Sequence, residues 1–151
     1  MEDPFSGLAG RYLASGETLR GIVRHTLLAR QLGEHLSGPP ARIADVGGGG
    51  GHQAIPLARR GYEVTILDPS RTMLDEARRR LDSEREAVRR RVRLVEDKGE
   101  RAAGILGRES FDAVLCHGVL MYLEDPAPLI AGLAAIACPD AVASVPKCKT
   151  L

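Results

Sequence analysis

Five consecutive glycines, Gly47–Gly51, directly follow a short apolar run that carries an acid, in the stretch RIADVGGGGGHQAI. Glycine has no Cβ, so another group can come very close to the backbone, but ordering five glycines costs much chain entropy. A bare flexible turn is therefore a poor explanation of this run. A ligand that lies against the backbone explains it better.

Composition limits the kind of protein. The 151 residues are 44% hydrophobic and 27% charged with a net charge of +1, which predicts one globular domain without a strong attraction to nucleic acid or membrane. No apolar run approaches the roughly 20 residues of a membrane span, and the N-terminus lacks a signal-peptide pattern. Cys116, Cys138 and Cys148 lack the paired spacing of a zinc site or a disulfide scaffold. We expect a cytoplasmic protein without a metal site.

Hydrophobic periodicity and turn residues predict helices that alternate with strands. The predicted helices cover 17–36, 52–60, a long segment from Ser70 to Val88, and 124–138, and the predicted strands cover 41–46, 62–68, 92–97, 111–117 and 141–145. This order predicts an α/β fold with a Rossmann-like, doubly wound parallel sheet. Residues 1–40 form a helical lead-in and residues 41–151 the sheet domain.

Polar residues end the first four predicted strands: Asp45, Asp68, Asp97 and His117. Open parallel sheets bind ligands at the carboxyl ends of their strands, near the point where the strand order reverses. We therefore expect these four side chains to surround one ligand site.

Two phosphate-binding interpretations of the glycines fail. A P-loop needs Lys and then Ser or Thr after its last glycine, and this chain has His52 and Gln53. The dinucleotide fingerprint needs glycines at positions one, three and six. Counting from Gly47 or Gly48 puts His52 or Gln53 at position six, and an earlier start puts Val46 at position one.

An acid followed by alternating glycines does fit: Asp45, Gly47, Gly49, Gly51. This pattern resembles the first motif of the class I S-adenosylmethionine-dependent methyltransferases. The resemblance implies that Asp45 lies near the ammonium of the cofactor. Gly47, Gly48, Gly49 and Gly51 would then lie against its methionine end, whose carboxylate suits a helix N-terminus.

Asp68 ends the second strand, 21 residues after Gly47, where a carboxylate can accept hydrogen bonds from both ribose hydroxyls. NAD-binding domains use an acid at similar spacing, so Asp68 alone does not separate the two cofactors. The stretch DPSRTMLDEA from Asp68 resembles the D-x-S-x-x-M-L-x-x-A segment of the methyltransferases and favours S-adenosylmethionine. The alternative role of Asp68 is a helix or turn cap.

The resemblance continues in LVEDKGE, where the family has its adenine-binding loop. It implies that Asp97 faces the adenine amino group and that Gly99 and Glu100 line the base. Three acids within five residues also fit a solvated loop, and that alternative stays open.

Two further residues follow from the resemblance. SFDAVLCHGVLMYLEDP, from Ser110, matches the family's fourth strand, and His117 would lie beside the transferable methyl as the one candidate base. Its alternative role is a cap of the next helical turn. The lead-in helix resembles a subgroup that includes the bacterial tRNA carboxymethoxyuridine methyltransferase, in which an arginine corresponding to Arg20 binds the methionine carboxylate. Arg20 also fits a plain surface position.

The chain departs from the family at its end. The family sheet has seven strands, whereas this sequence stops at Leu151, soon after the fifth, and CPDA replaces the usual turn with two glycines before that strand. Either the sequence is truncated or frameshifted, or it is a half-domain completed by a partner chain. An open sheet edge favours self-association or a partner.

The segment Arg71–Arg93 has nine arginines against five acids. It predicts either an RNA-facing surface or, as the favoured interpretation, a solvated face with pairs Asp75–Arg79, Glu76–Arg80 and Glu86–Arg90.

Together these patterns predict a methyltransferase that uses S-adenosylmethionine. Its acceptor is unidentified, with a tRNA wobble-uridine carboxylate or a small molecule as candidates. The alternative is a non-catalytic cofactor-binding half-domain that needs a partner, and a nucleotide-dependent oxidoreductase comes third.

Overall fold

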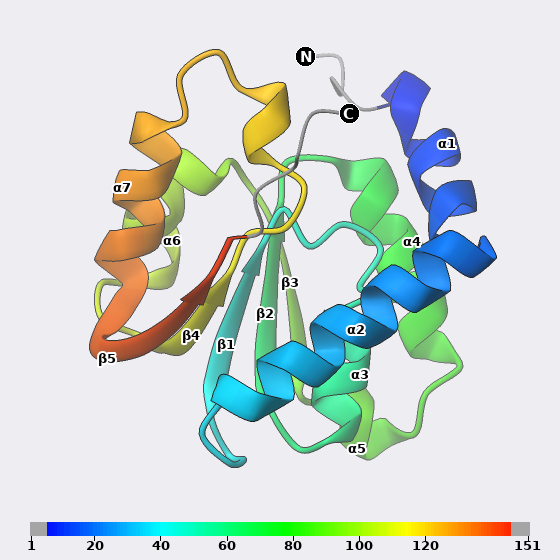
Figure 1. The fold of residues 1–151 in the computed structure, drawn as a ribbon, viewed down its shortest axis with the longest axis horizontal. Coiled ribbons are helices and arrows are strands. Elements are labelled where there is room, and N and C mark those ends of the chain that lie inside the picture. Colours follow the sequence, from blue (N-terminus) through cyan, green and yellow to red (C-terminus); the bar gives the residue numbers. More distant parts are fainter. Residues whose placement is uncertain (1–5, 146–151) are drawn as a thin grey trace.

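A computed structural model describes residues 6–145. Its centre is a five-stranded sheet in the order β3-β2-β1-β4-β5, with every neighbouring pair parallel (Figure 1). The strands are β1 (Arg42–Val46), β2 (Glu63–Asp68), β3 (Val92–Glu96), β4 (Phe111–Leu115) and β5 (Ala137–Ser144). The doubly wound α/β prediction is confirmed. Within the described residues β3 and β5 are the two edge strands.

Helices connect the strands and precede them. They are α1 (Ser6–Gly16), α2 (Leu19–His35), α3 (Ala54–Arg59), α4 (Arg71–Asp82), α5 (Glu86–Arg89), η1 (Gly99–Arg101), α6 (Ala102–Leu106), η2 (Leu120–Tyr122) and α7 (Ala127–Ile136). The segment predicted as a helical lead-in, 1–40, thus contains two helices in its described part. No helix among residues 6–145 is both long and apolar enough to cross a bilayer.

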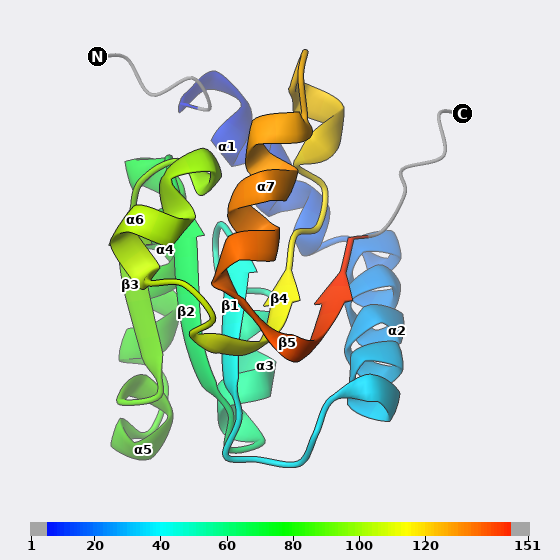
Figure 2. The same ribbon diagram turned by 90° about the vertical axis from the view of Figure 1, so that its left-hand side faces the viewer.

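The helices form a layer on each face of the sheet (Figure 2). Alternate strand residues such as Ile43 and Ile66 pack against α3 and α4, and their neighbours such as Ala44 and Leu67 pack against α6 and α7. Because both faces are covered, the inner strands are apolar almost throughout, as is usual for parallel sheets. Asp45 and Asp68 are therefore exceptions within buried strands.

Local signals explain several helix boundaries. The Ser70 hydroxyl accepts a hydrogen bond from the Met73 N–H at 3.3 Å, so Ser70 is the N-cap of α4 as predicted. Thr18 caps α2 in the same way through the Gly21 N–H. Gly61 follows α3 with φ of +103°, a conformation that glycine adopts readily.

Three sequence predictions need correction. The long helix predicted from Ser70 to Val88 is broken after Asp82, because the Ser83 N–H turns back to the Arg80 and Leu81 carbonyls and closes the last turn. The fifth strand begins at Ala137 rather than 141, directly after α7, so CPDA lies inside a strand. A register shift between Phe111 and Ala113 accommodates the longer strand.

The third correction concerns the ion pairs of the arginine-rich segment. Glu76 and Arg80 pair at 2.9 Å, and Glu86 pairs with Arg90, as predicted. Asp75 pairs with Arg78, because Arg79 bonds Glu76 instead. Four of the five acids of this segment thus pair with arginines, Glu84 with Arg59 of α3, which supports the solvated-face interpretation.

One contact between glycines holds the α7 layer close to the strand ends. A Cβ on Gly132 of α7 would lie 2.7 Å from the Gly99 carbonyl oxygen, and a Cβ on Gly99 would lie 2.3 Å from the Leu129 side chain. Real Cβ atoms do not approach backbone so closely, so the two elements can pack in this way only without those side chains.

We expect Gly132→Ala to lower the free energy of unfolding by about 1–3 kcal/mol, the usual cost of overpacking. Urea denaturation followed by circular dichroism measures it. Gly104→Ala, on exposed α6 with open space around it, is the matched control and should be neutral or stabilising by about 0.5–1 kcal/mol. Equal effects of the two changes would contradict the role given to the glycine contact.

Candidate functional site

The glycine loop joins β1 to α3 at the carboxyl end of the sheet. Gly47, with φ of +73°, donates its N–H to the Leu67 carbonyl at 2.7 Å and so ties the loop to β2. A Cβ on Gly48 would lie 2.6 Å from the Asp45 carboxyl group. The loop can fold back over Asp45 only because Gly48 has no side chain.

Asp68 anchors the same loop from the end of β2. One of its carboxylate oxygens accepts the Gly49 N–H at 2.9 Å, and the other accepts the Ser70 N–H at 2.8 Å. The Asp68 side chain is 6% exposed, so these bonds fix its orientation in a buried position. The carboxylate nevertheless lines an open cavity.

Two cavities meet above the strand ends. The Asp68 cavity, of about 300 Å³, lies between α1, the start of α4 and the loop after β4, and includes Tyr12, Pro69, Met73 and Val119 in its wall. The Asp45 cavity, of about 320 Å³, lies under α2. Its wall includes Arg24, His25, Gly48, His52, Gln53 and Met121 in addition to Asp45.

The Asp45 cavity collects polar atoms that lack partners. Among the described residues, five buried side-chain atoms have no hydrogen-bond partner within the protein, and all five belong to residues that line this cavity. They are His25 Nε2, Asp45 Oδ2, His52 Nε2, Gln53 Oε1 and His117 Nδ1. Buried polar groups are normally hydrogen-bonded, so this wall is suited to a polar ligand.

Burial changes the ionisation of these groups. It raises the pKa of Asp45 to about 7, with the nearby Asp68 charge as the second cause. It also lowers the pKa of His52 and of His117 to about 4 each, and lowers that of His25. The three histidines are therefore neutral at physiological pH, and each ring then has one nitrogen that accepts a hydrogen bond.

His25 and His52 link the lead-in helices to the glycine loop. Their rings stack at a centroid distance of 4.8 Å, and the Gln53 amide nitrogen lies 3.1 Å from His25 Nδ1. A Cβ on Gly16 would lie 2.6 Å from His52 Nε2, so the ring fits against the turn between α1 and α2. Through this contact the lead-in covers the Asp45 cavity.

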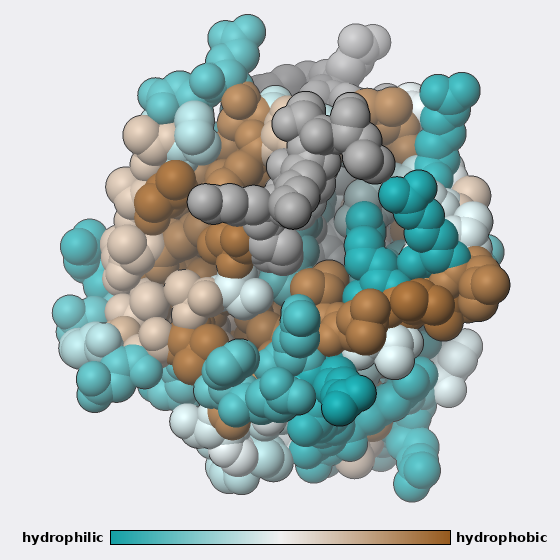
Figure 3. Space-filling model, viewed as in Figure 1, coloured by the Kyte–Doolittle hydropathy of each residue, from teal (hydrophilic) through white to brown (hydrophobic). Residues whose placement is uncertain are grey.

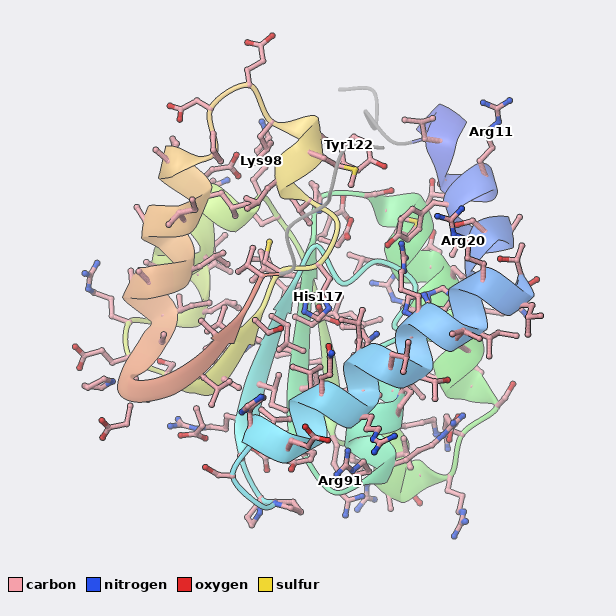
Figure 4. The ribbon with its side chains drawn as sticks, viewed as in Figure 1. Arg11, Arg20, Arg91, Lys98, His117 and Tyr122 are labelled. Carbon is pink, nitrogen blue, oxygen red and sulfur yellow. The ribbon has the colours of Figure 1, made fainter. Side chains whose placement is uncertain are left out.

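His117 lies at the end of β4, where both cavities meet, and Figure 4 places it at the centre of the site. Its Nε2 lies 3.0 Å from the Ser144 hydroxyl of β5, and its Nδ1 is one of the five unpartnered atoms. In contrast, Arg91 lies at the opposite end of the sheet (Figure 4).

The structure brings together only part of the predicted site. Asp45, Gly47, Gly48, Asp68 and His117 line one or both cavities, and Gly49 holds Asp68 through its N–H. Gly51, also predicted to bind the cofactor, lies at the start of α3 and lines neither of these cavities.

The other predicted residues lie apart from the cavities. Arg20 is exposed near the start of α2 (Figure 4), and Arg24, one turn later, reaches the Asp45 cavity. The Asp97 carboxylate accepts hydrogen bonds from the Lys98 N–H and from Arg101. Gly99 packs against α7, and Glu100 is exposed. Their roles toward a ligand stay predictions.

Sequence reasoning missed the contributions of the lead-in helices and of the loop end. Tyr12, Arg24, His25, His52 and Gln53 line the cavities, although none of them was predicted to bind a ligand. The available signal was spacing, since Arg24 follows Arg20 by one helical turn and His52–Gln53 directly follow the glycines.

Comparison with known proteins decides the family. Residues 44–143 match the family described as "Methyltransferase domain". The chain belongs to this family. The match spans β1 to β5 and so includes the glycine loop, Asp68 and His117.

Relatives of this methyltransferase domain carry different names. The tRNA 5-carboxymethoxyuridine methyltransferase of Escherichia coli K12 is 30% identical over 131 residues, covering 85% of this chain and 49% of the relative. The ubiquinone biosynthesis O-methyltransferase of Xanthomonas axonopodis pv. citri is 32% identical, covering 91% and 56%. The chain thus spans about half the length of the curated relatives it matches.

A solved structure with the same fold is the magnesium protoporphyrin IX methyltransferase of Synechocystis PCC 6803 with bound S-adenosylmethionine. It is 25% identical with a TM-score of 0.65, covering 76% of this chain and 53% of that protein. The predicted methyltransferase-type sheet is therefore confirmed over the part that this methyltransferase domain contains.

The raised pKa of Asp45 predicts how stability depends on pH. An acid whose folded pKa exceeds its unfolded value of about 3.8 destabilises the fold as pH rises from about 4 to about 7. We expect Asp45→Asn to raise the free energy of unfolding by a few kcal/mol at pH 8 and to change it little at pH 4.

Urea denaturation at both pH values measures the difference, and Asp140→Asn at an exposed site of β5 is the control. If the gain from Asp45→Asn were the same at both pH values, the assigned ionisation of Asp45 would be wrong.

Proposed function

We propose that this domain binds S-adenosylmethionine and transfers its methyl group to an acceptor beside His117. The observation that carries the proposal is the pair of joined cavities. One is lined by the oriented Asp68 carboxylate and apolar side chains, and the other by Asp45, Arg24 and unpartnered polar atoms. A nucleoside suits the first, and a zwitterionic amino acid suits the second.

The residues of each cavity fit one part of the cofactor. Asp68 would accept the ribose hydroxyls, while Met73, Val119 and Pro69 offer apolar surface to the base. Asp45 would face the ammonium, and Arg24 on α2 would face the carboxylate in place of the exposed Arg20. When bound, the cofactor supplies a methyl group on a sulfonium, an electrophile whose transfer depends mainly on positioning and exclusion of water.

His117 is the proposed base. Its ring is neutral at physiological pH because burial lowers its pKa to about 4. If its Nε2–H donates to the Ser144 hydroxyl, Nδ1 has a lone pair in the wall of the cavities and can accept a proton from the acceptor. An acceptor that is already ionised, such as a carboxylate, would need no base.

The two named relatives suggest two classes of acceptor. The tRNA 5-carboxymethoxyuridine methyltransferase suggests a modified uridine of tRNA, and the ubiquinone biosynthesis O-methyltransferase suggests an oxygen of a ubiquinone precursor. Arg78, Arg79, Arg80 and Arg90 are paired with acids and the net charge is only +1, which favours a small acceptor over a long RNA contact. With either acceptor, we propose that the protein acts in the cytoplasm.

Titration calorimetry with S-adenosylhomocysteine tests the cofactor assignment. We expect saturable binding that Asp68→Ala weakens at least tenfold, since charge-assisted hydrogen bonds contribute about 1.5–3 kcal/mol each. Asp75→Ala, on exposed α4, should bind like the unchanged protein. NADH should not bind.

The outcomes separate the alternatives. Binding without methyl transfer to any acceptor would favour the non-catalytic half-domain. NADH binding that excludes S-adenosylhomocysteine would favour an oxidoreductase, and failure of a folded chain to bind either would refute the cofactor proposal.

We also propose that two copies of the chain associate beside β5. The edge of β5 lies next to α2, whose outer face exposes an apolar stripe visible in Figure 3. The stripe consists of Leu19, Ile22, Val23 and Leu27, which are 48–79% exposed. Monomeric proteins rarely expose continuous apolar patches of this kind.

Sedimentation velocity should therefore detect a concentration-dependent dimer, which Val23→Arg on the stripe shifts to monomer. Ala14→Arg, exposed on α1 but outside the stripe, should leave the dimer intact. A chain that sediments as a monomer at all concentrations would refute the association.

A further inference from the structure

Five residues line both cavities and so form the wall that the cavities share: Tyr12, Gly47, His117, Gly118 and Tyr122. The present inference rests on the proposed cofactor. If the Asp68 cavity takes the nucleoside and the Asp45 cavity takes the amino acid, the sulfur that links those two parts belongs at the shared wall. The side chains of this wall then decide whether a positive charge is favoured there.

Only three of the five residues have side chains that reach the junction. Gly47 and Gly118 contribute backbone alone. His117 is engaged through Nε2 with the Ser144 hydroxyl, and Tyr122 on η2 is 51% exposed. Tyr12 is more buried than Tyr122 and approaches from α1, on the other side of the site.

The Tyr12 hydroxyl points at the loop that follows β4. A Cβ built on Gly118 would lie 3.7 Å from the Tyr12 oxygen, so the phenol reaches this loop next to His117. Tyr12 thereby spans the site from the lead-in to the end of β4. The Tyr12 side chain lines both cavities.

We propose that Tyr12 contacts the positively charged centre of the methyl donor and makes the domain prefer the charged donor over the neutral thioether that remains after transfer. A phenol attracts a cation in two ways, through the lone pairs of its oxygen and through the negative face of its ring. Of the side chains of the shared wall, those of Tyr12 and Tyr122 carry an oxygen, and Tyr12 is the more buried of the two.

The ionisation of the phenol leaves it uncharged. Burial raises the pKa of Tyr12 above its usual value of 10.0, although the Arg24 guanidinium, which lies beside the phenol and hydrogen-bonds to it, acts in the opposite direction. One lone pair of the phenol oxygen is thus engaged by Arg24, and the other is left for a ligand. Asp45 and Tyr122 also face the phenol and raise its pKa further. Tyr12 is therefore neutral at physiological pH and supplies a dipole and a lone pair rather than a full negative charge.

Binding of three ligands by the full chain tests the proposal without an acceptor. S-adenosylhomocysteine has a neutral thioether, S-adenosylmethionine has a sulfonium, and sinefungin has a protonated amine in place of the sulfonium methyl. In Tyr12→Phe, which keeps the ring, we expect S-adenosylhomocysteine to bind within about twofold of the unchanged protein. The two charged ligands should lose about tenfold, which corresponds to about 1.4 kcal/mol for the lost contact between the phenol oxygen and the positive charge.

Tyr122→Phe is the matched control, since it removes a phenol oxygen from the same shared wall at a more exposed position. It should leave the preference for charged ligands unchanged. The proposal is overturned if Tyr12→Phe weakens all three ligands equally, if it weakens none, or if the selective loss occurs in Tyr122→Phe instead. No binding of S-adenosylhomocysteine by the unchanged, folded protein would refute the proposed function itself.

A spectroscopic measurement covers the case in which Tyr12→Phe does not fold. The sequence contains only three tyrosines, so ring-labelled tyrosine gives three nuclear magnetic resonance signals, which Tyr62→Phe and Tyr122→Phe assign by elimination. The Tyr12 signal should differ between the sinefungin and S-adenosylhomocysteine complexes, while Tyr62, whose hydroxyl donates to the Ser37 carbonyl, should not respond. Identical Tyr12 signals in the two complexes would overturn the proposal.

Discussion

The site depends on one carboxylate and the two backbone amides that it holds. Asp68 ends β2, and its oxygens accept the Gly49 N–H from the glycine loop and the Ser70 N–H from the start of α4. One buried side chain therefore fixes the relative positions of a strand, a loop and a helix. It also lines a cavity, so the group that organises the fold is available to a ligand, and structural and binding roles cannot be separated at this residue.

The sequence allowed the strands and the residues at their ends to be predicted, because both follow from local pattern. Asp45 and Asp68 interrupt apolar runs, and each run is followed by glycine or by a helix cap. The glycine loop was identifiable because only a close approach explains it, and the Asp45 carboxyl group below Gly48 is one such approach. Gly99 could not be interpreted locally, because its closest contact is with α7, about thirty residues later.

Three of the residues that sequence reasoning missed, Tyr12, Arg24 and His25, lie on the lead-in helices, where the sequence pattern is least informative. Tyr12 and His25 are single polar or aromatic residues on helices with both apolar and charged neighbours. Which face of each lead-in helix turns toward the site depends on the packing of α1 and α2 against each other. It also depends on the fit of His52 beside Gly16. The proposed role of Arg24 in place of Arg20 is an example, since one helical turn separates a solvent-exposed arginine from one in the cavity wall.

The order of the contributing residues along the chain has a consequence for biosynthesis. The site extends from Tyr12 on α1 to Ser144 on β5, which holds His117, so nearly the whole described chain must leave the ribosome before the site exists. The lead-in helices are made first and pack against each other, but their contacts with the glycine loop form only after that loop has been made. The proposed ligand site is thus completed late, and a nascent domain gains stabilisation from binding only once β5 has joined the sheet.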